Sequence, residues 1–145
     1  MAYFTQTFTI VNNSNYTLYL DTHGSKNLGD GKWPTSVAPH ATSASFVQTG
    51  TFSVNPTAVY SLQGANPPLN AYLHFYCAGV DPLVHVNMTL QFSQPPLFMG
   101  SAIFETNSHS NQTRTASNNS TPLLEITTVD NGSWTGSATF TIGQN

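Results

Sequence analysis

Residues 84–92, VHVNMTLQF, alternate apolar and polar side chains without an exception. Side chains of an extended strand point to opposite faces in turn, so a period of two gathers the five apolar side chains on one face and the four polar ones on the other. The stretch therefore predicts a strand with one buried face, and the rest of the chain must supply the opposite wall of a core.

A second strand is predicted just upstream. Residues 71–76, AYLHFY, alternate in the same way, with Leu73 and Phe75 on one face. The opposite face carries Tyr72, His74 and Tyr76. The short link before Val84 contains Gly79 and the turn-forming pair Asp81-Pro82. We predict that these two strands form the central antiparallel pair of the fold.

The other apolar residues recur in short alternating segments, and no window has a helical period. Residues 4–11 and 16–21, joined by the turn cluster NNSN, predict a hairpin. Further strands are expected at 41–49, 52–54, 58–62, 97–104, 123–129 and 138–142, with the hairpin turn DNGS at 130–133. About ten short strands without a helix are typical of a sandwich or barrel. We predict an all-β chain, residues 1–145, folded as one antiparallel β-sandwich domain.

Two segments do not read as strands. Residues 22–34, THGSKNLGDGKWP, predict a loop, in which Trp33 either anchors the loop by burying its indole or stacks on a ligand. Residues 105–121 contain Ala116 as their only apolar side chain. Loops of this length without structure are usually functional or disordered.

Charge is scarce. Only three basic and six acidic side chains occur among 145 residues, so neutral amides and hydroxyls must cover the surface. Three scattered cations cannot supply the phosphate contacts that nucleic-acid binding needs, nor a polybasic attraction to anionic lipid. Such a surface suits neutral ligands such as sugar hydroxyls, zwitterionic head groups or further copies of the chain, or it serves only to keep the protein in solution.

The single cysteine, Cys77, rules out an internal disulfide. The first residues have neither a basic region nor a long apolar run, so we expect cytoplasmic synthesis without a signal peptide, and any release would take a non-classical route. The five histidines and six acids do not cluster in the sequence, and no catalytic or metal-binding spacing occurs. We therefore expect no enzyme activity, cofactor or metal. His74 and His85 could meet across the central pair, as a metal or acid-base couple or as a solvated pair.

Aromatic side chains beside amides and a carboxylate are what a sugar or a choline-type cation would use. The predicted ligand-binding residues are Tyr72, His74, Tyr76, Asp81, His85 and Trp33. The alternative for the tyrosines is packing against a second sheet.

A spaced pattern runs along most of the chain. It consists of residues 10–14 (IVNNS), Pro34, Val37, Pro39-His40, Phe46, residues 58–62 (AVYSL), Leu73-His74-Phe75, Asp81-Pro82, Leu90 and the final strand at 137–142. This order resembles the cytolysin/lectin β-sandwich group, which includes actinoporins, fungal fruit-body lectins and aegerolysins.

The resemblance implies an actinoporin-like sandwich that binds phosphocholine lipids or glycans. Of the tyrosine-rich lipid-binding cluster of actinoporins, only Tyr76 occupies a matching position. About three residues precede Phe4, where those toxins carry a pore-forming helix, so we expect recognition without perforation. Family lectins often form dimers or tetramers, which implies a homo-oligomer.

The predicted function is that of a lectin-like protein that recognises neutral glycan or sphingolipid head groups at cell surfaces, with a role in defence. A membrane surface is a candidate partner and nucleic acid is not. The alternatives are an aegerolysin-like lipid-binding component of a cytolytic toxin and a structural or storage protein.

Overall fold

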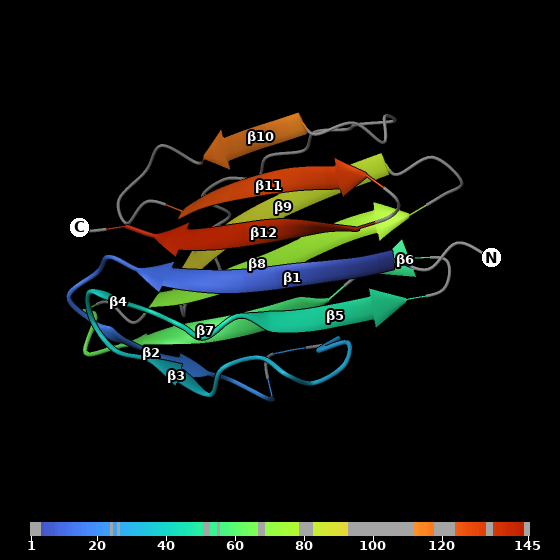
Figure 1. Cartoon of the computed structure of the whole chain (residues 1–145). Coiled ribbons are helices and arrows are strands. Elements are labelled where there is room, and N and C mark those ends of the chain that lie inside the picture. The colour runs from blue at the N-terminus through green and yellow to red at the C-terminus, as the bar shows by residue number, and fades with distance from the viewer. Residues whose placement is uncertain are drawn as a thin grey trace.

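The computed structural model describes residues 4–23, 25, 27–50, 53–54, 56–66, 69–78, 83–92, 112–117, 124–132 and 135–143. These residues form strands, turns and loops, and none of them is helical. Accordingly, no helix within these ranges is long and apolar enough to cross a membrane. The strands make two sheets of six, which lie one behind the other (Figure 1). The prediction of an all-β fold is confirmed.

The sheet nearer the viewer in Figure 1, sheet A, has a parallel pair in its interior. Its strands, in order, are β10 (Gln112–Ser117), β11 (Leu124–Gly132), β12 (Thr135–Ile142) and β1 (Phe4–Asn12), followed by β4 (Ala41–Thr42) and β5 (Phe46–Gly50), which share the remaining edge of β1. β1 and β12 run parallel, and the other pairs are antiparallel.

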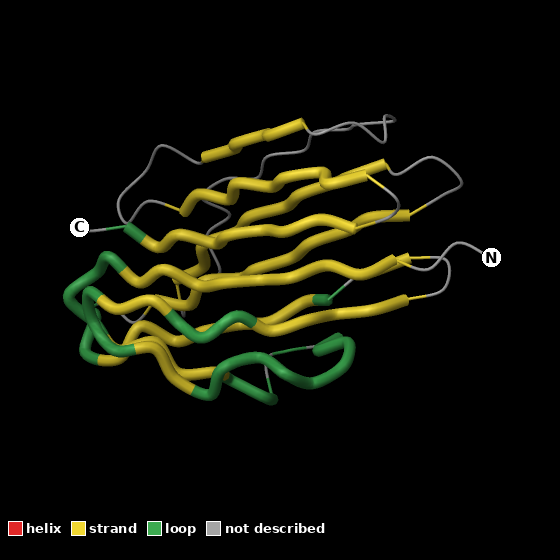
Figure 2. The backbone as a smooth tube through the Cα atoms, viewed as in Figure 1, coloured by secondary structure: helices red, strands yellow, loops and turns green. Residues whose placement is uncertain are grey.

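Sheet B, behind it, is antiparallel throughout. Its strands, in order, are β3 (Ser36–Val37), β2 (Thr17–Leu20), β7 (Thr57–Gln63) and β8 (Leu69–Ala78), with β6 (Ser53–Val54) continuing the β7 side of β8 and β9 (Leu83–Phe92) on its other side. Figure 2 shows the described loops gathered at the left end and along the lower side of the molecule.

The inner faces of the two sheets share one hydrophobic core. Phe8 and Phe140 of sheet A and Leu73 and Phe75 of sheet B are all almost completely shielded from solvent. Burying a large apolar side chain contributes roughly 1.5–3 kcal/mol, so contacts of this kind hold the layers together. The described arrangement is two-layered and β-sandwich-like.

Trp33 belongs to this core. Its ring is 5 % exposed and packs against Phe46, with centroids 5.0 Å apart, and its indole N–H donates to the carbonyl of Leu28 at 3.0 Å. Next to it, the Tyr60 hydroxyl donates to the carbonyl of Pro34 at 2.6 Å, and burial raises the pKa of Tyr60. The anchoring interpretation of Trp33 is confirmed, and its buried ring leaves little surface for a ligand to stack on.

The predicted pairing of the two aromatic strands is confirmed. β8 and β9 are antiparallel over ten residue pairs, from Leu69 opposite Phe92 to Ala78 opposite Leu83. Among the described strands β9 pairs with β8 alone, so β8 is the interior strand of the two and the prediction that both are central is half right. The gap expected between the strands at 52–54 and 58–62 is also present, since β6 ends at Val54 and β7 begins at Thr57.

The hairpin predicted from the NNSN turn is wrong. β1 lies in sheet A and β2 in sheet B, so the turn carries the chain from one layer to the other. The buried Asn12 fixes this crossing, because its side-chain amide donates to the carbonyls of Tyr16, Val37 and Ala38. Its Oδ1 accepts from the backbone N–H and the hydroxyl of Ser14. A turn held by one buried amide has the same local composition as a hairpin turn, so the local sequence does not distinguish a crossing between sheets from a hairpin.

Two other predictions are corrected. Residues 112–117, within the segment interpreted as a loop, form β10. The strand expected at 41–49 is divided into β4 and β5. The N–H of Ser43 still donates to the carbonyl of Ile10, but the N–H of Ile10 donates to the Ser43 hydroxyl instead of a backbone carbonyl, so the ladder is interrupted there. The strand predicted at 97–104 lies outside the described residues. The C-terminal hairpin is confirmed, since β11 and β12 are antiparallel with an irregularity between Asp130 and Gly132.

Candidate functional site

The candidate site lies on the outer face of sheet B and is built on β8. Ala71, Leu73 and Phe75 are buried in the core, whereas Tyr72 and His74 between them are half-buried and point away from it. This alternation is the one predicted from the sequence, and it follows from the pleat of the strand.

The register defines what lies beside these two residues. Tyr72 is opposite Val59 of β7 and Thr89 of β9, while His74 is opposite Thr57 and Asn87. Opposite positions of an antiparallel ladder belong to the same face. The outer positions of three strands are therefore next to one another.

Tyr76 and His85 form a directly opposite pair in this ladder, and His74 is diagonal to His85. The prediction that His74 and His85 are neighbours therefore holds at the level of register, although Tyr76 is the closer partner of His85. The side chains of Tyr76 and His85, and all of Asp81, lie outside the described residues.

A second row continues the face toward β2. Tyr19 is opposite Ser61, and Ser61 is opposite Asn70. Tyr19 is 45 % exposed, whereas Ser61 and Asn70 are half-buried. We call the five residues Tyr19, Ser61, Asn70, Tyr72 and His74 the β8 face. None of the five carries a formal charge, and His74 is the one with a titratable imidazole.

The floor of the β8 face is partly apolar. Val59, on the outer side of β7, is only 6 % exposed although it lies outside the cluster that fills the core. The chain after β2 runs along this edge, where the N–H of Asp21 donates to the carbonyl of Val59 and the N–H of Val59 donates to the Ser25 hydroxyl. The N–H of Thr57 donates to the carbonyl of Asn27. These hydrogen bonds hold Asp21, Ser25 and Asn27 against β7, next to the β8 face.

Burial lowers the pKa of His74 from its ordinary 6.5, because desolvation disfavours the imidazolium. The ring is consequently neutral near pH 7, with one nitrogen that donates and one that accepts. A neutral ring of this kind can bind hydroxyls or amides, and it carries no charge that would repel a cationic head group.

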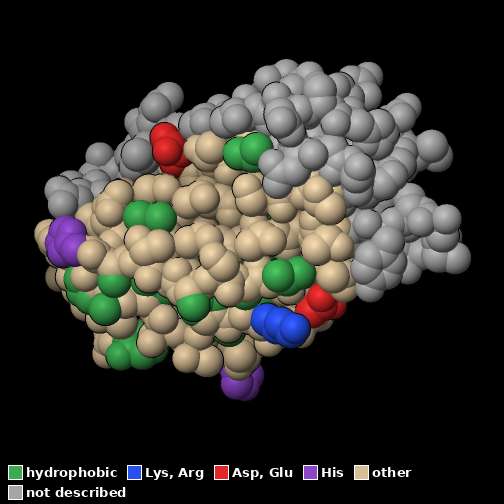
Figure 3. Space-filling view, in the orientation of Figure 1, with side chains coloured by type: hydrophobic (Ala, Val, Ile, Leu, Met, Phe, Trp, Pro, Cys, Tyr) green, Lys and Arg blue, Asp and Glu red, His purple; other side chains and the backbone are tan. Residues whose placement is uncertain are grey.

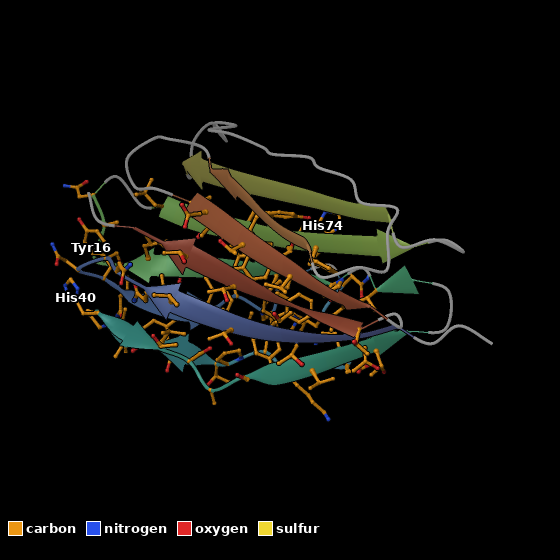
Figure 4. The ribbon with its side chains drawn as sticks, turned by 45° about the horizontal axis from the view of Figure 1, so that its top comes forward. Tyr16, His40 and His74 are labelled. Carbon is orange, nitrogen blue, oxygen red and sulfur yellow. The ribbon has the colours of Figure 1, made fainter. Side chains whose placement is uncertain are left out.

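Another histidine, His40, lies at one end of the molecule, away from His74 (Figure 4). Figure 4 shows His40 near Tyr16 at this end and His74 farther along the sheet. The His40 backbone has a positive φ of 59°, and its Nε2 lies 2.9 Å from Oδ1 of Asn15. His40 and the β8 face are separate features.

Within the described residues, no three His, Cys, Asp or Glu side chains come together in a way that would hold a metal ion. Of the predicted ligand-binding residues, the structure places Tyr72 and His74 on one face of β8, whereas Trp33 is buried in the core. The sequence analysis did not single out Tyr19, Ser61 and Asn70. The alternation of Leu18 and Leu20 with Tyr19 is a local signal that could have indicated an outward Tyr19, but its row depends on the register between β2, β7 and β8.

Comparison with known proteins gives no match for this chain, either among protein-family models or among curated proteins.

Proposed function

We propose that the chain is a non-enzymatic, lectin-like binding protein that recognises neutral glycans or sphingolipid head groups at cell surfaces through the β8 face. The observation that carries this proposal is the register, which makes Tyr19, Ser61 and Asn70 one row on the same face of sheet B as Tyr72 and His74.

The chemistry of these side chains fits a neutral ligand with several hydroxyls. An aromatic ring offers a flat apolar surface to the C–H face of a sugar or to a choline methyl group. Hydroxyl, amide and imidazole groups beside it supply donors and acceptors that fix the orientation of the ligand. No formal charge competes with these contacts at the five positions.

An open face of this kind binds one ligand weakly, so cell-surface recognition would rest on several copies. We include homo-oligomerisation in the proposal because linked sites raise the apparent affinity by effective concentration. The actinoporin-like sandwich and the kinship with fruit-body lectins or aegerolysins, implied by the sequence pattern, are part of the same proposal. The two-layer all-β arrangement is compatible with them.

The test is to mix purified protein with washed red cells and to score agglutination and haemoglobin release in the same wells. We expect agglutination without release, reversed by a soluble sugar. Agglutination that no free sugar reverses, together with flotation on sphingomyelin vesicles, would favour the aegerolysin-like lipid binder. Concentration-dependent assembly without binding to cells would favour a structural or storage protein and would overturn the proposal.

Tyr72→Ser locates the site. Loss of an aromatic stacking contact of about 0.5–1.5 kcal/mol lowers affinity by roughly two- to tenfold. The matched control is Thr7→Ala, a small change on the outer face of sheet A. Equal binding by both variants and the unmodified protein would show that the β8 face is not the site.

A further inference from the structure

The outer face of sheet A has a different chemistry from the β8 face. The outward positions of β1 are Thr5, Thr7, Thr9 and Val11, and the positions of β12 opposite them are Thr135, Ser137, Thr139 and Thr141. Seven of these eight carry a hydroxyl, none is charged and none is aromatic. We call these eight positions the threonine face.

The rows of this face extend to the neighbouring strands. Thr9 is opposite Thr139, and Thr139 is opposite Thr127 of β11, which in turn is opposite Thr115 of β10. At the other end of the row, the Thr9 hydroxyl lies 3.1 Å from the hydroxyl of Ser45. One row of hydroxyl-bearing residues therefore crosses sheet A.

The parallel pairing of β1 and β12 makes the array regular. Side chains lean along the direction of their strand, so those of two parallel strands lean the same way, whereas antiparallel neighbours lean in opposite directions. Outward positions repeat about every 6.7 Å along a strand and about every 4.8 Å between strands. The result is a two-dimensional grid.

The side chains of the grid are also stiff. Threonine branches at Cβ, which limits its χ1 rotamers, and all eight positions except the more exposed Thr135 are half-buried between their neighbours. Each hydroxyl can both donate and accept a hydrogen bond, and each threonine adds a methyl group beside it. Such preorganisation raises the affinity of a surface that binds through many weak contacts, because fewer side chains must be ordered on binding.

The composition of the grid narrows the choice of partner. A nucleic acid or an anionic membrane would need basic side chains, and a stacked sugar would need aromatic rings. The centre of a protein interface is apolar, but Val11 is the only apolar residue among the eight. Figure 3 shows this side of the molecule as mostly uncharged polar surface, with the acidic and basic side chains toward its margins.

We propose that the threonine face binds the surface of ice, an uncharged and periodic lattice of hydrogen-bond donors and acceptors. Hydroxyls at regular intervals replace hydrogen bonds between lattice waters, and the methyl groups fill the spaces between them. Adjacent strands of a sheet are twisted by roughly 20–25°, so only the few strands around β1 and β12 can lie flat against a crystal plane. We therefore expect the binding to shape ice crystals and to slow their recrystallisation. We do not expect a large thermal hysteresis, which is the difference between the melting and freezing temperatures of the crystal.

The test uses the purified chain and ice crystals observed in a cryomicroscope, with serum albumin as the negative control. We expect faceted crystals and smaller grains after annealing. Thr139→Lys, which places a long charged side chain in the middle of the grid, should abolish both effects. The matched control Thr17→Lys, on the outer face of sheet B, should leave both unchanged.

A lysine within the grid could also weaken the fold, so each variant is compared by circular dichroism and thermal unfolding. Thr139→Tyr is the second variant, since tyrosine is favoured in strands and is neutral but protrudes from the face. It too should abolish crystal shaping. Unfaceted crystals with the unmodified chain would overturn the proposal, as would full activity of a folded Thr139→Tyr variant. Neither result bears on cell agglutination, which depends on the opposite face.

Discussion

The ring of Phe8 on β1 meets the ring of Phe75 on β8 edge to face, with 5.1 Å between the centroids and 79° between the planes. The contact joins sheet A to sheet B in the middle of the core. It is one of several aromatic contacts of Phe8, which also packs on Phe46, Trp33 and Phe140.

Phe75→Ala should lower the free energy of unfolding by about 3–5 kcal/mol, because it removes a buried ring and leaves a cavity between the sheets. Urea unfolding followed by tryptophan fluorescence measures this loss. The neighbouring Tyr72→Ala, on the outer face of the same strand, is the control and should cost clearly less. Equal losses at the two positions would contradict the assignment of the inner and outer faces of β8.

Asn12→Ala should cost about 2–4 kcal/mol, since buried groups that lose their partners cost roughly 1–3 kcal/mol each. The carbonyls of Val37 and Ala38 and the N–H of Ser14 would lose the amide that binds them. Asn13→Ala changes an exposed amide one residue away and should stay within about 0.5 kcal/mol of the unmodified protein. Comparable denaturation midpoints for the two variants would show that the crossing between sheets does not depend on Asn12.

Gly136→Ala should destabilise the junction of β1, β12 and β11. A Cβ at this position would lie 2.6 Å from the carbonyl oxygen of Val129 and 2.8 Å from Oε1 of Gln6. The backbone must shift to relieve the first clash, and overpacking of this kind costs roughly 1–3 kcal/mol. Ser137→Ala, the next residue and on the outer face, is the control. A thermal midpoint for Gly136→Ala as high as that of Ser137→Ala would argue against this close approach.

His74 should make the stability depend on pH. Its pKa is lower in the folded chain than the ordinary 6.5, so below pH 6.5 the unfolded chain binds the proton more readily. The stability that the folded chain gains from a neutral His74 is fully present above pH 6.5 and is lost as the pH falls through the folded-state pKa. Unfolding free energies of the unmodified protein and His74→Gln, measured from about pH 8 to about pH 5, should converge or cross on acidification. Parallel curves would show that His74 is not desolvated.

Local patterns in the sequence predicted the strands well, because a half-buried strand has a period of two. In residues 71–75 buried and half-buried side chains alternate as predicted, and residues 84–92, predicted from the same pattern, form most of β9. The buried indole of Trp33 was one of two interpretations that composition alone left open, and its hydrogen bond to Leu28 decided between them.

The connections between strands could not be predicted in the same way. The cluster at residues 12–15 has the composition of a hairpin turn, yet Asn12 directs the chain into the other sheet through carbonyls more than twenty residues away. Likewise, residues 112–117 have almost no apolar pattern, but their pairing with β11 makes them a strand. The row that joins Tyr19 to Asn70 depends on pairing between distant strands, and so does the parallel contact of β1 with β12. No local pattern in the sequence predicts either of them.

The pairing of β1 with β12 also affects how the chain is made. Ribosomal synthesis delivers β1 long before β12, and nearly the whole length of the chain lies between Phe8 and its partner Ala138. Contacts between such distant residues form slowly, because a large loop must close first. Until β12 has emerged, the backbone groups along one edge of β1 have no partner strand, and an uncovered edge invites association with other chains. The nascent protein therefore depends on being kept apart from its neighbours until β12 has been translated.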